Sequence, residues 1–284
     1  MTGPFREIAD RVFIGRYPQW DVNVGVVVGS DGICVVDTRG TLKQGQEVRD
    51  QIARLAPPGA VTHVVNTHVH FDHVLGNAAF PAARKTAHAN AIAAMAGHIA
   101  QVKQACLEDA SPSDELGYTA DDLAELVASP LAVPESGFAV SAVIDLGDRA
   151  LRLSYAGRGH TDGDLAAAVS DVPVVFFGDL IEEAANPSYG TDCCPLDWAD
   201  TLTDHLARLP GGALVIPGHG LPVDRDFVAA QRDAVGIVAA VVRDRHTAGM
   251  SLADAMREPD TRLPYPLASL AEAFTRAWSE LAGP

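Results

Sequence analysis

The segment from His68 to His73 reads His-Val-His-Phe-Asp-His and so places four potential metal ligands within six residues. It directly follows the apolar segment 61–66, whose composition predicts a β-strand. Because side chains alternate along an extended chain, we expect His68, His70 and Asp72 on one side, and His73 to begin a turn and approach from another direction. Imidazole and carboxylate groups are ligands that zinc and similar divalent metals accept. The segment therefore predicts a metal site at the end of a strand.

Three further ligand candidates occur later in the chain, each directly after a glycine. They are His160, in a glycine-rich loop that follows a strand-like segment, and Asp179 and His219, each at the end of an apolar strand-like segment. A neighbouring glycine lets the backbone turn tightly and present the side chain of the next residue. Strand ends that meet at one edge of a sheet form a rigid scaffold for a site. The repeated pattern favours one assembled ligand set over a histidine-rich surface loop.

Strand-like and helix-like segments alternate in two groups. In the first, we expect strands near 11–16, 22–28, 33–37, 61–66 and 85–87, and helices near 43–56 and 90–106. In the second, we expect strands near 138–144, 150–155, 165–170, 174–177 and 213–216, and helices near 197–209, 224–248, 251–257 and 267–282. The intervening segment 108–137 is predicted to be mainly irregular. This alternation predicts a mixed α/β fold, an αββα four-layer sandwich of two mixed sheets flanked by helices.

Residues 1–284 are predicted to form a single domain, because the ligand series runs through most of the chain. A helical extension covers about 224–284, and its apolar residues must cover either the chain's own sheet or a partner subunit. A homo-oligomer is therefore one expectation. Since the extension lies beyond the last ligand in sequence, we expect it to affect solubility or assembly before metal content.

The charge of the chain narrows the range of partners. Lys and Arg number 21 against 37 Asp and Glu, a formal net charge of −16. Such a charge repels nucleic acid and anionic lipid, so we expect a small-molecule substrate and neither a nucleic-acid nor a membrane partner. No apolar signal segment begins the sequence, which predicts a cytoplasmic protein with reduced cysteines. The other histidines in predicted helices and strands are expected to be structural, namely His63, His98, His205 and His246.

The ligand candidates, in their order along the chain, resemble those of the metallo-β-lactamase-fold superfamily of metal-dependent hydrolases, over roughly residues 5–225. The resemblance implies two zinc ions per chain, with iron or manganese as alternatives. It assigns His68, His70 and His160 to the first ion. It assigns Asp72, His73 and His219 to the second, with Asp179 bridging both. The non-cysteine ligand at Asp179 and the Asp72-His73 pair place the chain nearer the glyoxalase II-like, lactonase-like and dinuclear β-lactamase-like branches.

The activity that this resemblance implies is hydrolysis of an ester, thioester, lactone or β-lactam bond in a small molecule. A hydroxide activated at the metals would attack the acyl carbon, and Asp72 would both bind metal and orient the nucleophile. Three alternatives stay open. They are a mononuclear non-haem iron enzyme of the persulfide dioxygenase type, a phosphodiesterase-type hydrolase and a non-enzymatic metal-bearing interaction protein.

Several residues near the ligands are further candidates. Asp37, at the end of a strand-like segment, could accept a hydrogen bond from a ligand histidine or be an ordinary turn residue. Trp20, Phe71 and Tyr189 could form a pocket wall or simply pack. Acidic residues, and no basic cluster, follow Asp179, which disfavours glyoxalase II itself, whereas Tyr189 keeps the lactonase interpretation open.

Overall fold

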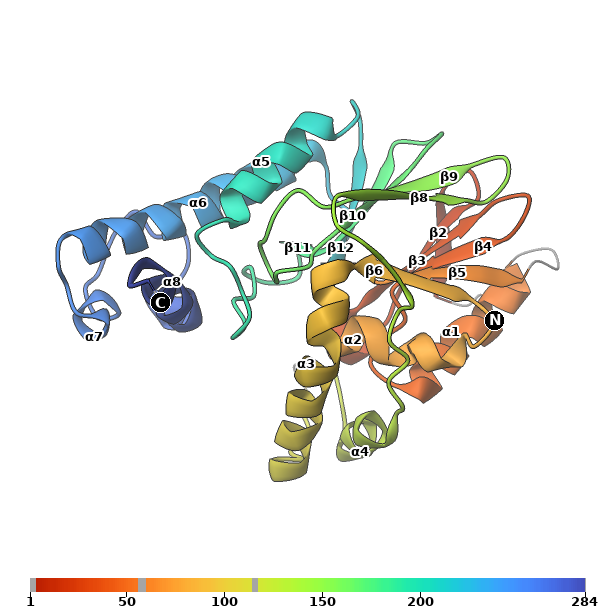
Figure 1. The fold of residues 1–284 in the computed structure, drawn as a ribbon, viewed down its shortest axis with the longest axis horizontal. Coiled ribbons are helices and arrows are strands. Elements are labelled where there is room, and N and C mark those ends of the chain that lie inside the picture. The colour runs from red at the N-terminus through yellow and green to blue at the C-terminus, as the bar shows by residue number, and fades with distance from the viewer. Residues whose placement is uncertain (1–3, 56–59, 114–116, 284) are drawn as a thin grey trace.

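Two mixed β-sheets pack face to face in the computed structural model, which describes residues 4–55, 60–113 and 117–283 (Figure 1). The first sheet has seven strands, in the order β1 (Phe5–Ala9), β2 (Val12–Arg16), β3 (Asn23–Val28), β4 (Ile33–Val36), β5 (Val61–Val65), β6 (Arg84–His88) and β7 (Ser136–Phe138). Strands β1 to β4 are antiparallel neighbours, and β4 to β7 are parallel neighbours.

The second sheet has five strands, in the order β12 (Leu214–His219), β11 (Val174–Glu182), β10 (Ala166–Val169), β9 (Ala150–Ser154) and β8 (Ser141–Asp145). Only β11 and β12 are parallel to each other. The inner faces of the two sheets meet in one apolar core, in which Val27 and Val65 from the first sheet cluster with Leu153 and Phe176 from the second. Burial of this alternating apolar face is the main force that holds the two sheets together.

Helices cover both outer faces. On the first sheet lie α1 (Leu42–Leu55), α2 (Phe71–Val74), the 3₁₀ helix η2 (Leu75–Ala79), α3 (Ala89–Glu108) and α4 (Ala120–Ala128). On the second lie α5 (Trp198–Arg208) and the start of α6 (Arg225–Thr247). The predicted αββα sandwich is therefore confirmed.

The C-terminal helices form a small core of their own beside the sandwich. Helix α6 extends away from the sheets and meets α7 (Leu252–Ala255), the 3₁₀ helix η3 (Leu267–Leu270) and α8 (Ala271–Leu281) (Figure 1). Leu196, from the segment before α5, is buried in this core together with Val242 and Phe274. Within the described part of the chain, no helix has the length and apolar character needed to cross a membrane.

Three expectations about local structure were wrong. Strand β1 precedes the first expected strand, and its half-exposed residues give only a weak apolar pattern. The segment 108–137 contains α4, which begins at a capping box formed by Thr119 and Asp122 and buries Leu123 and Leu126. Asp72 does not belong to an extended segment with His68 and His70, because the chain turns into α2 at Phe71.

Candidate metal centre

The ligand candidates come from separate elements that end at one edge of the two sheets. His68 and His70 follow β5, while Asp72 and His73 lie in α2. His160 lies in the loop between β9 and β10, Asp179 lies within β11, and His219 ends β12. Asp179 is thus inside a strand and not at its end, after an irregularity in strand pairing at Gly178.

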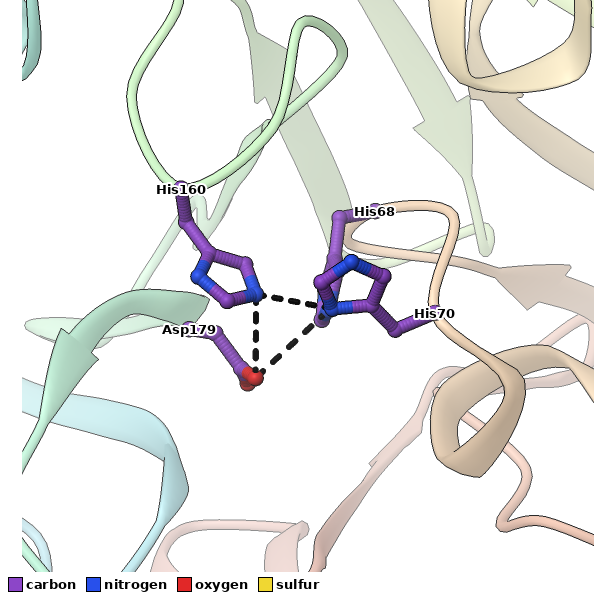
Figure 2. Close-up of side chains that lie close together, drawn as sticks. All are labelled: His68, His70, His160 and Asp179. Atoms are coloured by element: carbon purple, nitrogen blue, oxygen red, sulfur yellow. Dashed lines mark hydrogen bonds and ion pairs between the residues drawn. The ribbon is translucent and has the colours of Figure 1, made fainter. Parts of the chain in front are cut away.

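The first ligand group consists of His68, His70, His160 and Asp179, whose nearest ligand atoms all lie within 4.8 Å of one another. Figure 2 shows the three imidazoles and the carboxylate pointing toward a common centre from three parts of the chain. Nε2 of His160 lies 2.8 Å from Nδ1 of His70 and 3.4 Å from Oδ2 of Asp179. Nε2 of His68 lies 3.6 Å from the same Asp179 oxygen.

The second group consists of Asp72, His73 and His219. Oδ2 of Asp72 lies 3.5 Å from Nε2 of both imidazoles, and these two nitrogens lie 3.4 Å apart. Asp179 also reaches this group, with 3.2 Å separating its oxygens from Nε2 of His73 and from Nε2 of His219. Its carboxylate therefore lies between the two groups.

The residues fit bound divalent cations. Nitrogens of facing imidazoles approach each other, and Nε2 of His68 and Oδ1 of Asp179 are buried without a hydrogen-bond partner. Buried polar atoms without partners are costly, whereas a cation at each centre would accept the converging lone pairs. A set of imidazole nitrogens and carboxylate oxygens suits zinc, and also iron or manganese.

The five imidazoles are each held from behind at the ring nitrogen that faces away from the centre. His73 Nδ1 lies 2.9 Å from Oδ2 of Asp37, and His70 Nε2 lies 3.1 Å from Oδ2 of Asp192. The outer nitrogens of the other three lie 3.0 Å from Thr67 Oγ1 for His68, 3.1 Å from the Ser188 carbonyl for His160 and 2.7 Å from the Trp20 carbonyl for His219. Such partners orient a ligand ring and select its tautomer.

Asp37 contacts a ligand histidine and the segment that carries another. It follows β4 and adopts a left-handed backbone with φ of 62°. Besides contacting His73, it accepts hydrogen bonds from the backbone N–H of Thr67 at 2.8 Å and from its hydroxyl at 2.7 Å. The same Thr67 hydroxyl contacts His68, so Asp37 is linked to a ligand in each group.

The electrostatics of the centre favour positive charge. Burial alone would raise the pKa of the Asp179 carboxyl, but the surrounding imidazoles hold it well below its usual range. Burial would lower the pKa of His219, yet the facing Asp179 and Asp72 carboxylates raise it to about 10. By contrast, burial and the neighbouring His70 lower the pKa of His160 to about 4, which favours the neutral ring that a metal requires.

Two glycines beside ligands are needed for different reasons. Gly178 has φ of 54°, and a Cβ there would lie 2.4 Å from the Thr67 hydroxyl. Gly218 needs no unusual φ, but a Cβ there would lie 1.8 Å from Oδ1 of Asp179. Gly218 is therefore required by the close approach of β12 to the central carboxylate.

A cavity of about 520 Å³ opens over the centre. Ligand residues form its floor, and Trp20, Phe71 and Tyr189 all line it. The Trp20 and Phe71 rings meet edge to face, with centroids 5.2 Å apart. Its charged lining residues other than histidine are all acidic, namely Asp21, Asp72, Asp179 and Glu182. Of these, Asp21 is paired with Arg16 at 2.7 Å.

The sequence did not identify Glu182 or Asp192 as residues of the centre, and it assigned His98 only a structural role. Glu182 is 7% exposed, lines the cavity and brings its carboxylate near Asp179 and His219; burial and Asp179 raise its pKa to about 8. Asp192 contacts His70, and His98 stacks on the same ring with centroids 4.7 Å apart. No local motif marks Asp192 or His98, and Glu182 carried only the signal that it follows Asp179 by three positions in an apolar strand.

The chain is similar to known proteins in sequence and in fold. The sequence profile of the Metallo-beta-lactamase superfamily matches residues 17–219. The protein named Metallo-beta-lactamase type 2 from Bacteroides fragilis is 30% identical over 92 residues, which are 32% of this chain and 37% of that protein.

Among solved structures, the stereoselective inverting sec-alkylsulfatase Pisa1 from Pseudomonas sp. has a TM-score of 0.77 at 14% identity, over 100% of this chain and 50% of that one. A double mutant of this sulfatase gives the same TM-score and identity over 99% of this chain and 50% of that one. The chain thus spans half of the sulfatase and a smaller share of the lactamase, and at this identity the likeness to the sulfatase is one of fold.

Proposed function

The chain belongs to the metallo-β-lactamase superfamily, and from this premise we propose that it is a dinuclear zinc-dependent hydrolase acting on a small acyl compound. The bond cleaved is that of an ester, thioester, lactone or β-lactam. The observation that carries the proposal is the position of Asp179, whose carboxylate lies within 3.6 Å of imidazole nitrogens in both ligand groups. A single-metal site has no need of the second group.

Each group of residues would have a defined task. His68, His70 and His160 would hold one ion, Asp72, His73 and His219 the other, and Asp179 both. When bound, such ions would lower the pKa of a water and polarise a carbonyl oxygen. Asp72 lines the cavity and can accept a hydrogen bond from the attacking water. This hydrogen bond would orient a lone pair of the water toward the acyl carbon. Trp20, Phe71 and Tyr189 would bind the apolar part of the substrate.

The cavity wall favours a substrate that is uncharged away from the scissile bond. No lysine or arginine is among the residues that line it, so apart from bound metal ions the wall offers no cation to a charged group of the substrate. The carboxylates of a glutathione thioester lie away from its scissile bond, and such a wall would leave them unpaired. We therefore favour a neutral ester, thioester or lactone, although the fold resembles that of an alkylsulfatase.

A substrate panel tests this proposal directly. Zinc-loaded protein is assayed on neutral aryl esters, thioesters, lactones, a chromogenic β-lactam, a phosphodiester and an alkyl sulfate, each with and without chelator. We expect turnover of one or more neutral acyl compounds that chelation abolishes and zinc restores. Oxygen consumption on glutathione persulfide by iron-loaded protein, without hydrolysis of any acyl compound, would instead support the dioxygenase alternative.

A further inference from the structure

We infer that the C-terminal helices set the geometry of the first metal site, through the segment 183–197 that joins β11 to α5, with Asp192 as the positioning residue of His70. This inference rests on the metal centre of the proposed function and not on the reaction. It revises the expectation that the extension affects solubility or assembly before metal content.

Asp192 holds the His70 ring at its edge. Its two carboxylate oxygens lie 3.1 and 3.3 Å from Nε2 of His70, which leaves Nδ1 directed at the centre. His98 stacks on the face of the same ring with an interplanar angle of 27°, and its Nδ1 lies 3.8 Å from Asp192. The ring of His70 is therefore fixed both in its plane and against tilting.

The same segment supports a second ligand of the first site. The Ser188 carbonyl accepts from Nδ1 of His160, and the backbone N–H of Cys194 donates to the carbonyl of Gly159 at 2.9 Å. The ring nitrogens of the second group are held from elsewhere, since His73 contacts Asp37 after β4, and His219 contacts the carbonyl of Trp20. At the start of the segment, the backbone N–H of Glu183 donates to the His219 carbonyl at 3.4 Å, so the part that supports the first site alone is 188–197. A displacement of residues 188–197 should therefore disturb the first site and spare the second.

The segment is in turn fastened to the C-terminal helices. Nε of Arg276 in α8 donates to the Cys193 carbonyl at 3.2 Å, and Arg243 in α6 donates to the Leu196 carbonyl at 2.8 Å. The side chain of Leu196 is buried in the core formed by α6, α7 and α8. Two backbone carbonyls within four residues of Asp192 thus depend on donors from the extension.

The test measures metal affinity, which requires no substrate. Metal-free protein is titrated with zinc in competition with a chromogenic chelator, so that two binding steps are resolved. Asp192→Ala should weaken one step by roughly 10- to 100-fold and leave the other unchanged. Asp192→Asn keeps an oxygen acceptor for His70 and should recover most of the loss. Asp204→Ala is the control, because Asp204 is an exposed carboxylate whose ion pair is with Arg208.

Arg276→Met tests the link to the C-terminal helices without changing Asp192, which contacts His70 directly. It removes the donor to Cys193 while keeping an unbranched side chain, and should weaken the same step severalfold. Thr275→Ala is its control, since the Thr275 hydroxyl donates to the Ala271 carbonyl within α8. The visible spectrum of the cobalt-substituted protein should change in Asp192→Ala and Arg276→Met, because the geometry of one site changes.

The possible outcomes are distinguishable. Equal weakening of both steps, or unchanged affinity in Asp192→Ala and Arg276→Met, would overturn the inference while leaving the dinuclear centre intact. A fall in the thermal midpoint of the metal-free Asp192→Ala variant with no selective loss of one step would show a merely structural role. Failure of the wild-type chain to bind two ions would overturn the proposed metal centre and the inference with it.

Discussion

At the residue scale, Asp72 is the carboxylate proposed as a ligand in the second group alone, and it is both buried among the other ligands and part of the cavity wall. Its carboxylate is 3.5 Å from the imidazoles of His73 and His219, while its residue lines the space above the centre. A carboxylate in this position has two acceptor oxygens, so it can contact both a metal and the attacking water. An amide has one acceptor oxygen and an alkyl group has none.

Replacement of Asp72 by alanine should therefore lower turnover of the best substrate by roughly a hundredfold or more. The fold should persist, since α2 is held by the buried side chains of His73 and Val74. Initial rates, with circular dichroism and metal content measured on the same samples, check this. Activity within severalfold of wild type would mean that the nucleophile is not oriented by Asp72.

The sequence could predict the residues that converge on the centre, because each is of a metal-ligand type and follows or ends a strand-like segment. Asp37 could be predicted as a candidate for the same reason. Asp192 and His98 could not, because their relation to His70 exists only after the segment 183–197 and α3 pack over the centre. The carbonyls of Trp20 and Ser188 belong to no side-chain pattern at all.

At the scale of single elements, β12 has to pass close to β11 for His219 to reach Asp179. Gly218 permits this approach, and the substitution Gly218→Ala places a methyl group on the carboxylate. We expect it to lower the free energy of unfolding by roughly 1–3 kcal/mol and to weaken zinc binding. Urea unfolding and zinc titration check both effects. Gly211→Ala, whose Cβ would meet nothing within 4 Å, should leave both unchanged, and an equal effect of the two would contradict this account.

Helix α5 contains a buried histidine that should make the fold sensitive to acid. His205 is 3% exposed against Phe177, and burial lowers its pKa from its ordinary value of 6.5 to about 4. Below pH 6.5 the unfolded chain therefore binds a proton at this histidine that the folded chain does not bind. The free energy of unfolding that is present above pH 6.5 falls as the pH approaches 4, by roughly 3 kcal/mol from this group. His205→Leu should remove this part of the loss. Urea unfolding of metal-free wild type and variant at pH 7.5 and 5 measures the difference, and parallel pH dependences would exclude the role of His205.

Periodicity predicted the elements with long apolar faces, such as α5, where Trp198, Leu202 and Leu206 are buried on one side. It missed α4, whose nine residues lie in an acidic segment and are marked mainly by the Thr119 capping box. It also missed the start of α2, because the alternation of ligands in 68–73 suggests an extended chain. Short elements bury too few residues for the periodicity of their apolar residues to be recognised in the sequence.

At the scale of the whole molecule, the ligands come from both sheets, so the centre exists only when the two halves of the sandwich are packed together. The Asp179 carboxylate from the second sheet lies among histidines carried by the first, and the C-terminal helices support the segment that closes over them. Metal bound to the folded chain alone would stabilise it by mass action. The net charge of −16 adds to the attraction for divalent cations.

The number of metal ions per chain tests the central claim most directly. Protein purified under zinc-replete conditions and freed of loosely bound metal is analysed by mass spectrometry of the elements, with protein concentration from amino-acid analysis. The arrangement of two ligand groups around Asp179 predicts close to two transition-metal equivalents per chain. A reproducible value of one equivalent, or of none, would contradict a dinuclear centre.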